Sequence, residues 1–212
     1  MTSVTTDTLL KGLGCNMTGE SQVELFPEEC LSELSTRVLQ DLKALLLINA
    51  AIQNHKEWLH PEMLLKCLQG GNADLNVIGA LLSKTQDRRF AKAIEFCRAS
   101  KQKSKQPSRI LSLAARIGQS SYDPDFKIFG IKIAVITPGD DRKITSPSRL
   151  LRGSLFFKNR VLYGCNWRAD IISCMNLGFA NPSEIKKRLH CSYETAHRVF
   201  NDYTLFKQAT AS

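Results

Sequence analysis

Residues 168–203 constrain the fold most, because apolar residues recur there at helical spacing between clear breaks. This spacing predicts three short helices. The first covers residues 168–177 and ends at Gly178. Its inward-facing residues are expected to be Ile171, Ile172 and Met175.

The second and third helices have recognisable starts. Asn181 and Pro182 begin the second, because Asn can accept a hydrogen bond from a free first-turn amide and Pro lacks an amide that would be left unpaired. Ile185 and Leu189 lie four residues apart and give this helix an inward stripe. After a two-residue break, Ser192 is expected to cap the third helix. Its buried side should comprise Ala196, Val199, Phe200 and Tyr203.

Two helices joined by a short turn, the second with polar residues along its exposed N-terminal half, are typical of a helix-turn-helix. In such a motif the apolar back holds the second helix while its front enters the major groove of DNA. We therefore predict a helix-turn-helix at residues 168–203 that binds double-stranded DNA. The alternative is a plain three-helix bundle that serves as a scaffold or a protein-binding module.

Residues 192–201 read Ser-Tyr-Glu-Thr-Ala-His-Arg-Val-Phe-Asn. They resemble the recognition helix of lactose-repressor-family regulators, which reads Ser-Tyr-x-Thr-Val-Ser-Arg-Val-x-Asn, and the segment is similar to the helix-turn-helix of many prokaryotic winged-helix regulators. About twenty of the 212 residues are covered, so the resemblance implies a DNA-binding module only. The chain has Lys186, His190 and Ala196 where the family usually has Ala, Gly and Val. The nine residues after Tyr203 are too few for a full two-stranded wing.

This interpretation assigns two sets of DNA-binding residues. The predicted groove contacts are Tyr193, Glu194, Thr195, His197 and Arg198. The predicted phosphate contacts are Ser192, Lys186, Lys187, Arg188, Lys101, Lys103 and Lys105.

The charge distribution favours a polyanionic partner. Residues 1–75 contain 5 Lys or Arg and 10 Asp or Glu, whereas residues 76–212 contain 24 and 10, so a net −5 is followed by a net +14. A basic surface attracts phosphate polyanions by releasing their counterions. It would also attract anionic lipid or an acidic protein. Because no basic amphipathic helix stands out, we favour nucleic acid over a membrane.

The chain is predicted to be mainly α, with an N-terminal helical bundle and a small α+β C-terminal region that ends in the helix-turn-helix. The expected parts are a flexible arm (1–26), an acidic-to-mixed helical domain (27–99), a basic linker (100–108) and a basic α+β region (109–212). The bundle is expected to open with one long helix from Pro27 to about Gln53 and to bind a homodimer mate or a partner protein. Residues 126–136 are β-branched and partly alternating, which predicts a bent strand or a hairpin.

Other functional classes find little support. The seven cysteines are widely spaced without a CxxC pair, and Cys191 with His190 and His197 forms no regular four-ligand pattern, so we expect no metal site. No P-loop, nucleophile elbow or dinucleotide fingerprint occurs, so we expect no cofactor and none of the common enzyme activities. The start lacks the positive region of a signal peptide, and the longest apolar run is too short to span a bilayer.

The sequence thus predicts a cytoplasmic, winged-helix-like transcriptional regulator with no membrane span. The first alternative is an adaptor subunit whose acidic helices dock on a partner and whose basic surface meets an acidic protein or RNA. The second is an enzyme with an unfamiliar site.

Overall fold

The computed structural model of the chain describes residues 4–17, 25–38, 41–100, 122–136 and 141–210. Within them it holds twelve α-helices and no strand, which confirms the mainly α class. The chain divides into two compact units, which we call the N-terminal unit (residues 1–145) and the C-terminal unit (residues 146–212). The division therefore falls after Thr145 and not at the expected linker, most of which lies outside the described residues.

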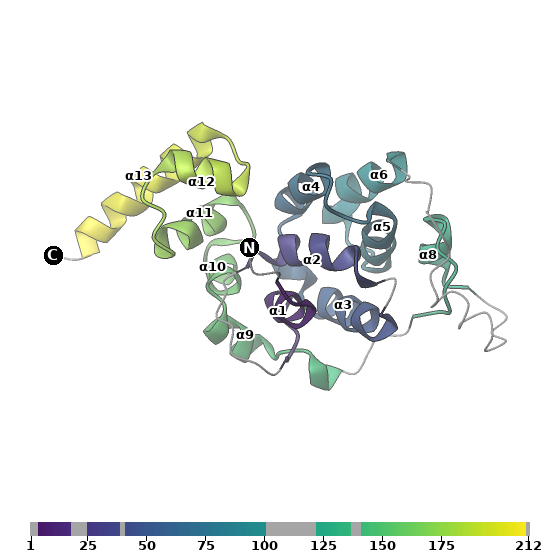
Figure 1. The fold of residues 1–212 in the computed structure, drawn as a ribbon. Coiled ribbons are helices and arrows are strands. Elements are labelled where there is room, and N and C mark those ends of the chain that lie inside the picture. The colour runs from purple at the N-terminus through teal and green to yellow at the C-terminus, as the bar shows by residue number, and fades with distance from the viewer. Residues whose placement is uncertain (1–3, 18–24, 39–40, 101–121, 137–140, 211–212) are drawn as a thin grey trace. The chain divides into compact units, whose positions relative to one another are not determined.

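The N-terminal unit is built from helices around α2 (Figure 1). They are α1 (Thr6–Gly12), α2 (Pro27–Ser35), α3 (Leu42–His55), α4 (Pro61–Gln69), α5 (Leu75–Lys84), α6 (Ala91–Ala99) and α8 (Pro124–Ile128). Helix α2 contacts α1, α4 and α5, and α5 also contacts α6 and α8. Short 3-10 helices are η2 (Lys56–Trp58), η3 (Arg88–Phe90) and η4 (Asp141–Lys143).

The long helix expected from Pro27 to about Gln53 is wrong. Helix α2 ends at Ser35, and α3 begins anew where the Asp41 carboxylate accepts a hydrogen bond from the Ala44 N–H at 3.1 Å. An Asp immediately before an apolar run is a strong helix start, so it interrupts a hydrophobic stripe that continues in the sequence.

The first part of the chain is also more ordered than expected. Residues 6–12 form α1, capped by the Thr5 hydroxyl, and α1 packs on α2 and α3. Leu9, Leu10 and Leu13 are buried in the core of the unit. The flexible-arm interpretation of residues 1–26 is therefore wrong for α1, because these leucines gain more from burial than the backbone loses in freedom.

The strand or hairpin predicted over residues 126–136 is wrong as well. The segment starts inside α8, turns at Gly130 (φ 77°) and makes one isolated bridge, between Ala134 and Tyr122. Most of its aromatic and branched residues fill the helical core instead of a sheet, namely Phe126, Phe129, Ile131, Ile133 and Ile136, whereas Ile128 and Val135 are about half exposed. Gly79 on α5 admits the Phe129 ring, since a Cβ there would lie 2.2 Å from a ring carbon.

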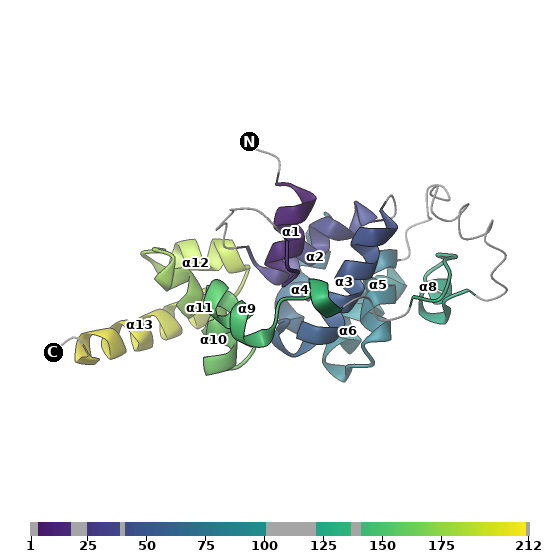
Figure 2. The ribbon, with the colours of Figure 1, turned by 90° about the horizontal axis from the view of Figure 1, so that it is seen from below.

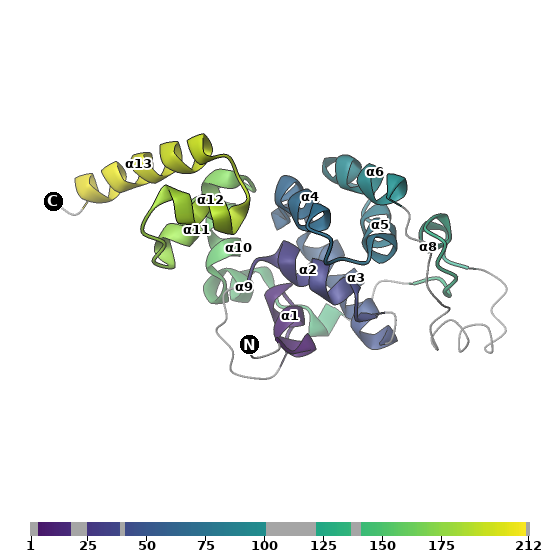
Figure 3. The same ribbon diagram turned by 45° about the horizontal axis from the view of Figure 1, so that its top comes forward.

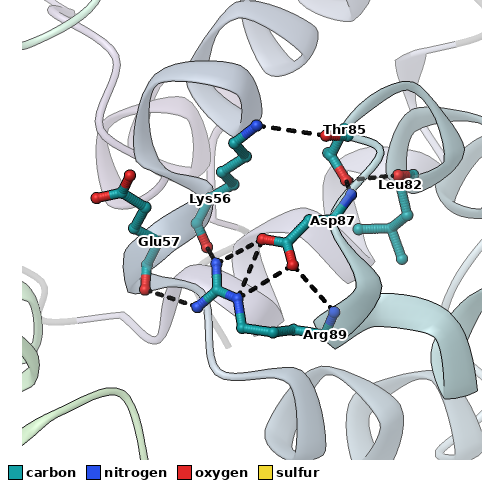
Figure 4. A network of polar contacts seen from close by, with 6 residues as sticks. All are labelled: Lys56, Glu57, Leu82, Thr85, Asp87 and Arg89. Carbon is teal, nitrogen blue, oxygen red and sulfur yellow. Dashed lines mark hydrogen bonds and ion pairs between the residues drawn. The ribbon is translucent and has the colours of Figure 1, made fainter.

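A guanidinium group ties the end of α3 to the turn between α5 and α6 (Figure 4). Arg89 donates from Nη1 to the Glu57 carbonyl at 3.0 Å, from Nη2 to the Lys56 carbonyl at 2.9 Å and from Nε to the Asp87 carboxylate at 3.0 Å. Lys56 Nζ donates to the Thr85 carbonyl at 3.3 Å. The five donors of Arg suit this task, because carbonyls at a helix end lack partners within the helix.

The C-terminal unit contains α9 (Pro147–Gly153), α10 (Leu155–Tyr163), α11 (Trp167–Asn176), α12 (Pro182–Leu189) and α13 (Tyr193–Thr210). Helix α10 packs on α11, and α11, α12 and α13 contact one another pairwise (Figure 2). Its larger buried apolar side chains are Leu150, Phe156, Phe157, Ile171, Ile172, Ile185, Leu189 and Val199.

No helix in the described parts of the chain is both long and apolar enough to cross a bilayer.

Candidate nucleic-acid interface

The start of α12 follows the sequence prediction. The Asn181 side chain accepts a hydrogen bond from the Glu184 N–H at 3.0 Å, and Pro182 occupies the first turn. Glu184 reaches back to the Ala180 N–H at 3.4 Å. The Asn181 contact satisfies a first-turn amide that would otherwise lack a partner, so local chemistry sets where α12 begins.

The turn between α12 and α13 is made by His190. Its backbone adopts the left-handed conformation, with φ 55° and ψ 25°, at the position where the lactose-repressor family usually has Gly. A Cβ in this region costs about 1 kcal/mol relative to Gly. Leu189 and Cys191 on either side are both buried, which holds the turn in place. A non-Gly residue therefore makes this tight connection between α12 and α13 at some cost.

Ser192 caps α13 as predicted. Its Oγ accepts a hydrogen bond from the Thr195 N–H at 3.0 Å, and the two hydroxyl groups lie 2.8 Å apart. A phosphate contact by Ser192 would have to share this hydroxyl with the cap.

The phase of α13 also agrees with the sequence prediction. Ala196 and Val199 are buried, and Phe200 and Tyr203 are half-buried. The predicted groove residues lie away from this stripe: Tyr193, Glu194, His197 and Arg198 are exposed, and Thr195 is half-buried. The N-terminal half of α13 thus presents these side chains to solvent together, and their contact with DNA stays a prediction.

Aromatic and amide contacts order part of the exposed side of α13. The rings of Tyr193 and His197 lie 5.7 Å apart between centroids. The Asn201 amide nitrogen lies 3.3 Å from His197 Nε2. A row of stacking and hydrogen-bonding groups therefore runs along this side for two turns.

Basic residues gather in the last turn of α12. Lys186 and Lys187 are exposed and have no ion pair within the described residues, whereas Arg188 is half-buried and interacts within the chain. Positive side chains at this end also stabilise the helix dipole. The same two lysines can therefore serve the helix and still face an external polyanion.

Charge on α13 is mixed. Exposed Glu194 and Asp202 accompany Arg198 on this helix. The C-terminal unit as a whole contains ten Lys or Arg and four Asp or Glu. The net positive charge of the unit therefore comes mainly from the other helices, and the outward side of α13 is chemically varied.

A buried ion pair joins α10 to α11, the helix on which α12 and α13 pack. Arg160 on α10 donates from Nε to Asp170 on α11 at 2.8 Å, and both side chains are fully buried. Beside it, the Asn159 amide donates to the Ser173 hydroxyl at 2.9 Å. Neither Arg160 nor Asp170 was predicted from the sequence to have a role. The sequence held one sign of this pair: the charged residue Asp170 lies directly beside the apolar stripe of α11.

The three linker lysines proposed to contact phosphate, Lys101, Lys103 and Lys105, lie outside the described residues.

No group of three or more His, Cys, Asp or Glu side chains that could hold a metal ion occurs among the described residues. Cys191 is buried, and this burial raises the pKa of its thiol above the ordinary value, which keeps the thiol protonated near neutral pH. Its position beside His190 is explained by packing of the turn.

Comparison of the chain with protein-family models, curated proteins and solved structures found no match.

Proposed function

We propose that the chain is a DNA-binding transcriptional regulator that uses α12 and α13 as a helix-turn-helix. The observation that carries this proposal is the exposure of Tyr193, His197 and Arg198 on one side of a helix whose opposite side is buried. A recognition helix needs this division, since its back must be fixed while its front enters the major groove.

The exposed residue types suit base and phosphate contacts. A guanidinium group such as that of Arg198 can bond two acceptors on guanine, and a carboxylate such as that of Glu194 can accept from the cytosine amino group. Lys186 and Lys187 offer point charges for phosphates. In this proposal α13 supplies sequence discrimination and α12 supplies most of the salt-dependent attraction.

The winged-helix form of the motif is not part of this proposal. Helix α13 runs through residue 210, and no strand occurs among the described residues. The proposed DNA-binding element is therefore the trihelical unit alone, by which we mean α11, α12 and α13.

The adaptor reading is favoured by a separate observation on α10. Val161 and Leu162 are 46% and 62% exposed there, although Phe156 and Phe157 on the same helix are buried. Exposed neighbouring apolar residues are typical of protein-binding surfaces. In this second candidate function the trihelical unit is a scaffold, and an acidic protein or RNA meets the basic residues.

Retention of the intact chain on immobilised mixed-sequence duplex DNA separates the two functions. A DNA-binding regulator is retained at low salt and elutes steeply as salt rises, because each phosphate contact releases a counterion. An adaptor passes through at low salt. Selection of bound fragments from random duplexes then gives the target sequence, and enrichment of no sequence would contradict sequence-specific regulation.

A further inference from the structure

Helix α10 carries apolar side chains on the side that faces away from the core of the C-terminal unit. Phe156 and Phe157 are buried, whereas Val161 and Leu162 are 46% and 62% exposed. Lys158 is also exposed and lies on the same side, because residues three and four positions apart are neighbours on a helix. Within its unit, α10 packs on α9 and α11 (Figure 3). We call Lys158, Val161 and Leu162 the α10 surface.

The exposed charges in this part of the unit are all positive. Residues 146–169, which cover α9, α10 and the start of α11, contain five Lys or Arg and no Asp or Glu. One of the five, Arg160, is buried against Asp170. The exposed ones are Arg149, Arg152, Lys158 and Arg168. The exposed acidic residues of the unit, Glu184, Glu194 and Asp202, lie on α12 and α13. The α10 surface therefore belongs to a segment of one charge sign.

The combination of apolar and positive groups indicates the chemistry of a partner. Positive side chains favour an anionic partner, and Val161 and Leu162 gain when apolar groups cover them. The phosphate backbone of a nucleic acid offers no apolar groups to these two residues. A helix that lies on a membrane needs a wide apolar side, but Phe156 and Phe157 are used in the core of the unit. An acidic protein segment can supply both carboxylates and apolar side chains.

We propose that the α10 surface binds an acidic segment of a partner protein. Apolar side chains of that segment cover Val161 and Leu162, and its carboxylates pair with Lys158. The proposal does not depend on DNA binding, which we place on α12 and α13. Because the surface is small, and interfaces below about 1,200 Å² are weak and transient, the complex should dissociate readily.

Selection of random short peptides on the immobilised intact chain provides a probe. The enriched peptides should carry net negative charge together with apolar residues. Because any basic surface attracts acidic peptides, variants must then locate the site. Failure to enrich any peptide, or enrichment of peptides without acidic residues, would overturn the proposal.

Fluorescence anisotropy of one selected peptide, synthesised with a dye, locates the site. Leu162→Ser should weaken binding by at least about ten-fold, because the leucine no longer contributes its burial. Leu205→Ser, at a residue 64% exposed on α13, is the matched control and should leave the affinity unchanged. Lys158→Ser should weaken binding by about two- to five-fold at low salt, and Lys187→Ser on α12 should not. Equal losses in the two leucine variants or in the two lysine variants would place the peptide elsewhere and overturn the proposal.

Thiol labelling of the intact chain tests whether the α10 surface is accessible. Leu162→Cys should react with a maleimide as fast as Ser183→Cys at an exposed position of α12, above the background of the native cysteines. The selected peptide should slow only the first reaction. Slow labelling of Leu162→Cys without the peptide would show that another part of the chain covers this surface, and would overturn the proposal.

Vesicles of phosphatidylserine and phosphatidylcholine test the membrane alternative. The intact chain should not sediment with them at physiological salt. Binding that is lost in Leu162→Ser would make the occupant an anionic membrane and would contradict a protein partner.

Discussion

The two units can be compared by which of their positive side chains the fold uses in internal contacts. In the N-terminal unit, three basic residues close internal contacts: Arg37 pairs with Glu33, Lys84 donates to Asp123 at 2.7 Å, and Arg89 binds Asp87 together with two carbonyls. These three charges hold helices and turns together, and their donors are occupied by the fold. Other basic residues of this unit are exposed and form no ion pair within the described residues, namely Lys43, Lys92, Lys127 and Lys132.

In the C-terminal unit, Arg160 has a comparable role through its buried pair with Asp170, and Arg152 donates to the Ser148 carbonyl at 3.2 Å. Lys186, Lys187 and Arg198 are exposed and form no ion pair within the described residues. Net charge alone does not reveal this difference. A basic residue is available to a polyanion only when its own fold does not use it, and Lys186, Lys187 and Arg198 on α12 and α13 meet this condition on two helices that contact each other.

The largest effect is expected from breaking the buried ion pair between Arg160 and Asp170. Asp170→Ala should destabilise this unit by about 3–5 kcal/mol, because it leaves the Arg160 charge buried without its partner. Denaturant unfolding of a Trp58→Phe background, in which Trp167 reports on the C-terminal unit, measures the change. Asp202→Ala removes an exposed carboxylate from the same unit and should change stability by less than about 0.5 kcal/mol. Equal effects would show that the buried pair is not what supports the unit.

A somewhat smaller loss should follow removal of a core side chain beneath the proposed interface. Leu189 is 1% exposed, so Leu189→Ala should cost about 2–5 kcal/mol through lost burial and a cavity. Leu205→Ala, at a residue 64% exposed, is the matched control and should be nearly neutral. The same Trp167 signal records both, and a neutral Leu189→Ala would mean that α12 does not pack through this side.

In the N-terminal unit the internal charges should make stability depend on acid pH. Burial of Asp123 by itself raises its pKa, but the hydrogen bonds from Lys84 and from the Ile136 and Phe126 amides, together with the Lys84 charge, outweigh it and lower the pKa. The carboxylate therefore stabilises the fold fully above its unfolded pKa of about 4, and this stabilisation is lost as the pH falls through the lower folded value.

Lys84→Met should bring the folded pKa of Asp123 closer to its unfolded pKa. The pH range over which ionisation of Asp123 changes the stability should therefore become narrower. Unfolding of a Trp167→Phe background, reported by Trp58, should show a flatter decline in stability below about pH 4. Lys92→Met, at an exposed lysine of α6, should keep the wild-type slope. An unchanged slope in Lys84→Met would contradict the role assigned to the Lys84–Asp123 pair.

Features fixed by neighbouring residues could be predicted from the sequence. The caps at Asn181 and Ser192 each need one side chain and one amide three residues later, so their signal is local. The burial of Leu189 and Val199 follows from helical spacing in the same way. For this reason the arrangement of exposed residues on α13 agrees with the prediction, although their partner does not follow from it.

Features that depend on distant parts of the chain were missed. The Arg160–Asp170 pair requires knowing that α10 packs on α11. Residues 126–136 have the composition of a strand, but Phe129 finds space over Gly79 on α5, and core packing overrides the local preference. The new helix start at Asp41 was missed for a different reason. Its capping signal is local, but the apolar pattern continues on both sides of it and predicted one long helix.

The central claim is that the basic residues left unused by the C-terminal fold bind DNA, and a fluorescence titration of a selected duplex with the intact chain tests it most directly. Arg198→Ala should weaken binding by about 1–3 kcal/mol with unchanged stability, because its side chain is exposed and would contact a base. Lys158→Ala removes an exposed positive charge from α10 in the same unit and should change affinity far less. Equal losses of affinity in the two variants would show that the chain binds DNA only through general charge attraction. Absence of binding by the intact chain even at low salt would contradict the account.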